Sequence, residues 1–149
     1  MAPSWVISKN KKNYAKLVPD AEKKRFDIQV VSDASADEIK AASEGTLQSG
    51  NLVYEINGEV YCTPIKTIRG DYRTEEGSNK NRLRQWEKNN FKPQLSDIFQ
   101  ERLYCIQWIT QETLENFRQE TYFASVTEED LERDRKVEHI VENNLTTWQ

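Results

Sequence analysis

Alternating apolar and polar positions predict three short strands at the start of the chain. Residues 4–8 and 14–18 are apolar runs separated by a Lys/Asn cluster, and Phe26, Ile28 and Val30 alternate with their neighbours in a third run. Pro19 and Asp20 predict the turn before that third strand. The pattern indicates a small antiparallel meander.

The next segment predicts a short helix and then a hairpin. Residues 35–38 begin the helix with carboxylates in its first turn, and it should end before Gly45. The dipeptide Asn57-Gly58 lies between two apolar runs, and both residue types accept positive φ, so it predicts a two-residue hairpin. Residues 65–68 are predicted to extend the second strand as far as Gly70.

Apolar periodicity then stops for a stretch. Residues 70–81 combine glycine, charge and turn formers, which predicts an exposed, mobile loop. The following connector contains two aromatic residues, Trp86 and Phe91, which we expect to anchor it.

The densest run of strand-forming residues comes late in the chain. Residues 103–109 are apolar on both faces, which predicts a central strand, and residues 120–126 should return as its partner. Thr127 and Asp130 form a capping-box pattern for a helix that should run to about Thr146. Five residues mark its apolar face at helical spacing: Val137, Ile140, Val141, Leu145 and Trp148.

These elements predict an α+β fold, with antiparallel sheets and hairpins packed with a long C-terminal helix. The length of 149 residues favours one domain over residues 1–149. No apolar run approaches the ~20 residues of a membrane span, and no signal peptide is visible, so we expect a cytoplasmic protein and no membrane partner. Cys62 and Cys105 lie in separate apolar runs, which predicts buried free thiols.

Catalytic and metal-binding patterns are missing from the sequence. Zinc takes about four Cys or His ligands, and the chain has only Cys62, Cys105 and His139, without a paired knuckle. The five glycines do not cluster into a phosphate-cradling loop. We therefore assign no catalytic residue and no metal ligand.

Charge is distributed unevenly along the chain, although the formal net charge is only −4. Basic residues concentrate near the start and around residues 69–84, whereas residues 112–142 are rich in carboxylates. Basic residues interleaved with aromatic ones are typical of surfaces that contact nucleic-acid phosphates, although lysine-rich turns also keep sheet edges soluble. The candidate DNA-binding residues are Lys9, Lys11, Lys12, Lys23, Lys24, Arg25, Arg69, Arg73, Arg82 and Arg84.

Several segments together resemble the central region of bacterial and archaeal adenine-specific DNA methylases that carry a zinc-ribbon insert. The most specific part is DIFQERLYCIQW at residues 97–108, followed by YFASVTEEDLERDRKVE and a terminal Trp-Gln. The resemblance extends back through RLRQWEKNNFKPQLSD and, more loosely, to LVYEINGEVYCTPIKTIRGD and WVISK. It covers most of the chain.

The resemblance implies a zinc knuckle that this chain has lost. In many members of that family the segment corresponding to residues 54–58 looks like a C-P-x-C-G knuckle, where this sequence has Tyr54 and Asn57 in place of the cysteines. A degenerate zinc-ribbon-like hairpin is therefore expected, with apolar contacts replacing the metal.

The resemblance also implies a parent enzyme that uses S-adenosylmethionine in restriction-modification or phage defence. The chain contains no Pro-Pro motif and no glycine-rich cofactor turn, so we expect a non-catalytic accessory domain of a larger methylase. It would position double-stranded DNA or brace the catalytic domain of the parent chain. The alternative is a protein–protein interaction module that never contacts DNA.

Overall fold

The computed structural model describes residues 1–88, 90 and 93–145, and the chain divides into two compact units. Unit 1 comprises Met1–Tyr14 and Ala34–Arg102, and unit 2 comprises Ala15–Asp33 and Leu103–Gln149. Each unit is described by itself. A single accessory domain over residues 1–149 stays a prediction.

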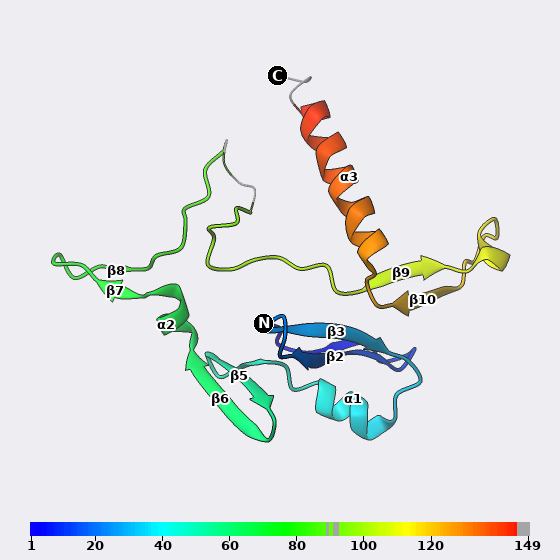
Figure 1. Cartoon of the computed structure of the whole chain (residues 1–149), viewed down its shortest axis with the longest axis horizontal. Coiled ribbons are helices and arrows are strands. Elements are labelled where there is room, and N and C mark those ends of the chain that lie inside the picture. Colours follow the sequence, from blue (N-terminus) through cyan, green and yellow to red (C-terminus); the bar gives the residue numbers. More distant parts are fainter. Residues whose placement is uncertain (89, 91–92, 146–149) are drawn as a thin grey trace. The chain divides into compact units, whose positions relative to one another are not determined.

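The fold is α+β, as predicted, with antiparallel sheets and hairpins and a C-terminal helix (Figure 1). The first sheet has the order β1 (Val6–Ser8), β2 (Asn13–Asp20) and β3 (Arg25–Val31), which confirms the three strands. The turn predicted to open at Pro19 and Asp20 lies at residues 21–24, because both residues still belong to β2, and the Asp20 carboxylate accepts the Lys23 N–H at 2.9 Å. Among the described residues, β1 pairs with β2 only at Asn13 and Tyr14, so Pro19 has no β1 partner that would need its missing N–H.

Helix α1 (Ala36–Ala42) of unit 1 begins where it was predicted. Ser35 caps it, because its hydroxyl accepts the Glu38 N–H at 3.2 Å while the Glu38 carboxylate accepts the Ser35 N–H at 2.8 Å. The first residues of the chain lie along the end of this helix. The N–H of Trp5 donates to the Ala42 carbonyl at 2.8 Å, and the N–H of Gly45 donates to the Pro3 carbonyl at 3.1 Å.

The predicted Asn57-Gly58 hairpin is confirmed. It joins β5 (Asn51–Ile56) to β6 (Glu59–Pro64), and β4 (Leu47–Gln48) adds a third strand beside β5. Asn57 has φ of 53° and Gly58 has φ of 83°, the signs that a two-residue turn of this kind requires. The rings of Tyr54 and Tyr61 stack across the two strands with their centroids 5.3 Å apart.

Two predictions for the rest of unit 1 are wrong. Residues 65–68 do not extend β6, because the chain turns at Pro64 into the short helix α2 (Ile65–Arg69), which ends at Gly70 in the left-handed conformation. Residues 70–81 also contain strands: β7 (Tyr72–Arg73) and β8 (Asn79–Lys80) form a small, exposed hairpin. Its mobility stays a prediction.

In unit 2, β9 (Ile106–Ile109) pairs antiparallel with β10 (Thr121–Ala124), as predicted for these partners, and the short 3₁₀ helix η1 (Gln111–Thr113) lies in the connection. The prediction of a central strand covered on both faces is wrong. β9 belongs to a two-stranded sheet, and Trp108 is 38% exposed. Ser125, after β10, accepts the Val30 N–H of β3 at 2.8 Å.

The capping box of helix α3 (Glu128–Leu145) is confirmed. The Asp130 carboxylate accepts the Thr127 N–H at 3.0 Å, and the Thr127 hydroxyl accepts the Asp130 N–H at 3.3 Å. The predicted end at Thr146 lies outside the described residues. Of the predicted apolar face, Val137 and Ile140 are exposed, and the other three side chains lie outside the described part.

Buried apolar residues are small in the part of the chain that the structure describes: Ala15, Ala34 and Ala42. Trp86 is 60% exposed rather than an anchor, and Phe91 lies outside the described residues.

Both cysteines are free as predicted, but Cys62 is exposed and only Cys105 is partly buried. Within the part of the chain that the structure describes, no helix combines the length and the hydropathy of a membrane span.

Candidate nucleic-acid interface

The two units differ strongly in formal charge. Unit 1 has thirteen basic and eleven acidic residues, a net charge of +2, whereas unit 2 has eight basic and fourteen acidic residues, a net charge of −6. A positive net charge favours the approach of phosphates and a negative net charge disfavours it, because the interaction of a polyanion with a protein follows the local charge. Unit 1 is therefore the place to look for a nucleic-acid interface.

The candidate residues of the first sheet lie in two separate turns. Lys9, Lys11 and Lys12 belong to the turn between β1 and β2 in unit 1, and Lys12 has a positive φ of 52°. The remaining three, Lys23, Lys24 and Arg25, lie at the other end of β2 and belong to unit 2. The structure thus does not gather the six residues into one site.

The second turn is also partly neutralised by its own carboxylates. The Lys23 ammonium lies 3.2 Å from the Asp20 carboxylate, and the Arg25 guanidinium lies 3.1 Å from that of Asp27. Hydrogen bonds from the Lys23 backbone and side chain lower the pKa of Asp20, because they stabilise its charged form. Lys24 is the cation of this turn that has no carboxylate contact among the described residues.

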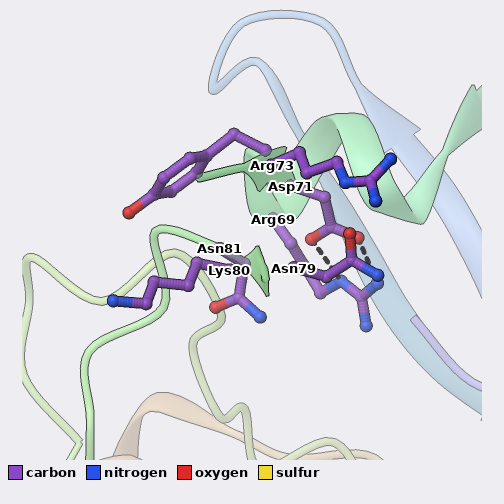
Figure 2. A pocket seen from close by; sticks show the side chains of 7 residues that line it. Arg69, Asp71, Arg73, Asn79, Lys80 and Asn81 are labelled. Carbon is purple, nitrogen blue, oxygen red and sulfur yellow. Dashed lines mark hydrogen bonds and ion pairs between the residues drawn. The ribbon is translucent and has the colours of Figure 1, made fainter. Parts of the chain in front are cut away.

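The four candidate arginines all belong to unit 1 and lie on or beside the β7–β8 hairpin. Three of its cations have exposed side chains and no acidic partner among the residues described in unit 1, and we call these the basic hairpin surface: Arg73, Lys80 and Arg82. A hollow of about 510 Å³ lies against the hairpin (Figure 2). It is lined by Arg69, Asp71, Tyr72, Arg73, Asn79, Lys80 and Asn81.

The hairpin register decides which side chains share a face. Tyr72 lies opposite Lys80, and Arg73 lies opposite Asn79, so each pair projects from its own side of the ribbon. Figure 2 shows the Lys80 ammonium and the Arg73 guanidinium directed to opposite sides. Arg73 Nε donates to the Gly77 carbonyl at 3.2 Å, which holds the guanidinium near the turn.

Arg69 and Arg82 differ in how their charges are used. The Arg69 guanidinium donates two hydrogen bonds to the Asp71 carboxylate, one of them at 3.1 Å, so its charge is largely balanced within the hollow. The Arg82 side chain lies over Gly70, where an added Cβ would come within 2.8 Å of Arg82 Cδ. Glycine at position 70 thus allows the positive φ and leaves room for the Arg82 side chain, which a Cβ would displace.

Arg84 is committed to the protein itself. Its Nε and Nη2 donate to the two Asp97 carboxylate oxygens at 2.7 and 2.8 Å, and Nη1 donates to the Asn90 carbonyl at 2.8 Å. These hydrogen bonds from Arg84, together with the Gln94 N–H, lower the pKa of Asp97 to about 2. The guanidinium also lies 5.4 Å from the ring centroid of Trp86. Arg84 therefore ties Asn90 and Asp97 together rather than offering a charge to a ligand.

A second hollow, of about 530 Å³, lies beside this ion pair. Its lining includes Arg84, Trp86, Asp97 and Phe99, and it shares Asn81 with the first hollow. The two hollows are therefore neighbours within unit 1.

No family model, curated protein or solved structure matches this chain. Its function must therefore be inferred from its own residues.

The described part of the chain contains no group of side chains arranged for covalent catalysis or for metal binding. No three His, Cys, Asp or Glu side chains described there gather as a metal-binding set, and the side chain of His139 lies outside the described residues. Burial raises the pKa of the Cys105 thiol, which lowers its thiolate content and its reactivity. What the described site can do chemically is bind an anion.

Sequence reasoning missed Lys80 as a member of this site. The signal was present, because a lysine next to Asn79 and eight residues after Tyr72 would face Tyr72 in a hairpin centred on residues 74–78. Residues 72–80 have no apolar alternation, so the hairpin itself was not predicted.

Proposed function

We propose that this chain is a non-catalytic accessory domain of a larger, S-adenosylmethionine-dependent DNA adenine methylase, and that unit 1 holds double-stranded DNA by its phosphates. The observation that carries the DNA contact is the basic hairpin surface, whose three cations have no acidic partner among the described residues. The parent family is supported by the resemblance at residues 97–108 and the segments around it.

The physical basis is the gain from releasing the counterions of DNA. Each phosphate that a lysine or arginine neutralises sets free condensed cations. The logarithm of the affinity therefore falls by about 0.9 per phosphate contact for each tenfold rise in salt concentration. The three cations of the basic hairpin surface have no ion pair among the described residues to break when they contact a phosphate. Arg69 and Arg84 would each have to break an ion pair with a carboxylate. The proposal therefore places the contact on Arg73, Lys80 and Arg82.

Duplex affinity measured across a series of salt concentrations tests the contact. In the triple variant Arg73→Gln, Lys80→Gln, Arg82→Gln, the slope of log affinity against log salt should shrink by as much as about 2.7. Replacing Lys11, Lys12, Lys23 and Lys24 by Glu should weaken binding further if the turns also reach the DNA. Lys136→Gln, an exposed lysine of α3, is the matched control and should leave the slope unchanged. Absence of duplex binding at low salt would refute the DNA role.

The accessory role makes a separate prediction about chemistry. Incubated with duplex DNA and labelled S-adenosylmethionine, the chain alone should transfer no methyl group, because the cofactor turn and the Pro-Pro motif expected of the catalytic domain lie elsewhere. Methyl transfer by this chain would overturn the assignment. In the parent sequence, a D/N-P-P-Y/F motif should occur outside these residues.

Unit 2 favours a second role, contact with protein. It combines a net charge of −6 with exposed apolar side chains at Trp108, Phe117 and Tyr122, a composition that repels DNA and suits a protein surface. We propose that unit 2 braces the catalytic domain of the parent chain. If this is the chain's only role, Trp108→Ala should weaken binding to that domain while duplex DNA binds neither the wild type nor the variant.

A further inference from the structure

Two exposed aromatic side chains accompany the basic hairpin surface, and contact with duplex phosphates does not use them. Tyr72 is 51% exposed on β7, and Trp86 is 60% exposed just after the hairpin. Each lines one of the two neighbouring hollows of unit 1. Exposing large aromatic rings costs hydrophobic free energy, so rings kept exposed beside a basic surface favour a flat ligand with negative charge.

Tyr72 is placed to hold one nucleotide. It lies directly opposite Lys80 in the hairpin, so the ring and the ammonium project from the same face, with Cβ atoms about 5 Å apart. A base stacked on the Tyr72 ring would leave its phosphate within reach of the flexible Lys80 side chain. Lys80 has no acidic partner among the residues described around it.

Trp86 provides a second and more rigid surface. The Arg84 guanidinium lies 5.4 Å from its ring centroid, and Arg84 is itself fixed by two hydrogen bonds to Asp97. One face of the indole is thereby supported, while most of the residue stays exposed. Arg82 lies between the two aromatic residues in sequence, and its side chain is exposed and lies over Gly70.

We propose that residues 72–86 bind unpaired nucleotides of single-stranded DNA, with bases stacked on Tyr72 and Trp86 and phosphates on Lys80 and Arg82. Bases of an intact duplex are stacked on one another and cannot present their faces to these rings, so the two aromatic residues distinguish unpaired from paired DNA. This inference rests on the proposed phosphate contact with DNA and adds that the same surface also binds unpaired nucleotides through the two rings.

Fluorescence anisotropy with a labelled single strand of about 12 nucleotides, and with the same sequence as a duplex, tests the inference. Tyr72→Leu and Trp86→Leu should each lower single-strand affinity by about fivefold or more, the value of one lost base stack, and leave duplex affinity within about twofold. Tyr72→Phe keeps the ring and should bind as the wild type does. Tyr122→Leu removes an equally exposed tyrosine, 50% exposed in the acidic unit, and should change neither affinity.

The outcomes separate the two proposals. Single-strand binding that weakens about fivefold or more in Tyr72→Leu and is retained in Tyr72→Phe supports stacking. If binding of both DNA forms depends on Lys80 and Arg82 but on neither ring, the stacking inference is wrong. The phosphate contact is then still supported. Absence of binding to both forms at low salt overturns both proposals. A far-ultraviolet circular dichroism spectrum of each variant confirms that it is folded.

Discussion

Gly45→Ala should destabilise unit 1 through a clash with the start of the chain. An added Cβ at this position would lie 2.1 Å from the Ala2 carbonyl oxygen and 2.4 Å from the Pro3 carbonyl carbon. Both are backbone atoms, so no side-chain rotation relieves the overlap, and the segment of residues 2–4 has to move away.

Three hydrogen bonds hold that segment and give the size of the effect. The N–H of Gly45 donates to the Pro3 carbonyl at 3.1 Å, that of Leu47 to the Ala2 carbonyl at 3.0 Å, and that of Ala2 to the Thr46 hydroxyl at 3.1 Å. At about 0.5–1.5 kcal/mol each, their loss amounts to roughly 1.5–4.5 kcal/mol. This is a large share of the about 5–15 kcal/mol that stabilises a typical domain.

Gly50→Ala is the matched control, because it introduces backbone strain without a steric clash, whereas Gly45→Ala introduces a clash. Gly50 has φ of +78° and nothing within 4 Å of an added Cβ, so alanine there costs only backbone strain, about 1–2 kcal/mol. Both substitutions restrict the unfolded chain equally, and that contribution cancels between them.

Urea unfolding of the two variants and hydrogen exchange at the Leu47 amide provide the assay. Gly45→Ala should lose the protection of the Leu47 N–H, whereas Gly50→Ala should keep it. If Gly45→Ala costs no more than Gly50→Ala and the Leu47 amide stays protected, the packing of residues 2–4 against Gly45 is wrong.

Three further predictions follow from single contacts. Thr127→Ala removes the hydroxyl that caps α3 and should lower the free energy of unfolding by about 1 kcal/mol, while Thr127→Ser retains it, as measured by urea unfolding. Asp97 has a folded-state pKa of about 2, below the ordinary carboxyl value of about 3.9, so its contribution is present above that value and is lost as pH falls from about 4 to about 2. The stability difference between wild type and Asp97→Asn should therefore shrink over that range, and a constant difference would contradict the ion pair with Arg84. A thiol reagent should modify exposed Cys62 quickly and Cys105 slowly, and equal rates would contradict their different burial.

Local signals in the sequence were reliable guides to the fold. The Asn57-Gly58 turn and the Thr127–Asp130 capping box each depend on a few adjacent residues, and both are confirmed. Burial was harder to predict, because it depends on partners far away in sequence. The apolar run at residues 103–109 predicts a strand covered on both faces, yet β9 has only β10 as a strand partner in the described structure.

The site could be predicted only in part for the same reason. Arg73 and Arg82 stand out in the sequence by charge, but the pairing of Arg84 with Asp97 links residues thirteen positions apart and leaves no pattern. The β7–β8 hairpin has two-residue strands without apolar alternation, so neither its register nor the facing of Tyr72 and Lys80 could be anticipated. Short exposed hairpins are specified by turn geometry more than by hydrophobic pattern.

Amide chemical-shift mapping during titration with duplex DNA tests the central claim most directly. The claim predicts that the amides of residues 69–82 shift in a salt-dependent manner, while those of β9, β10 and the acidic first turns of α3 do not. Shifts confined to β9, β10 and α3, or none at low salt, would contradict the assignment of the DNA contact to the basic hairpin surface.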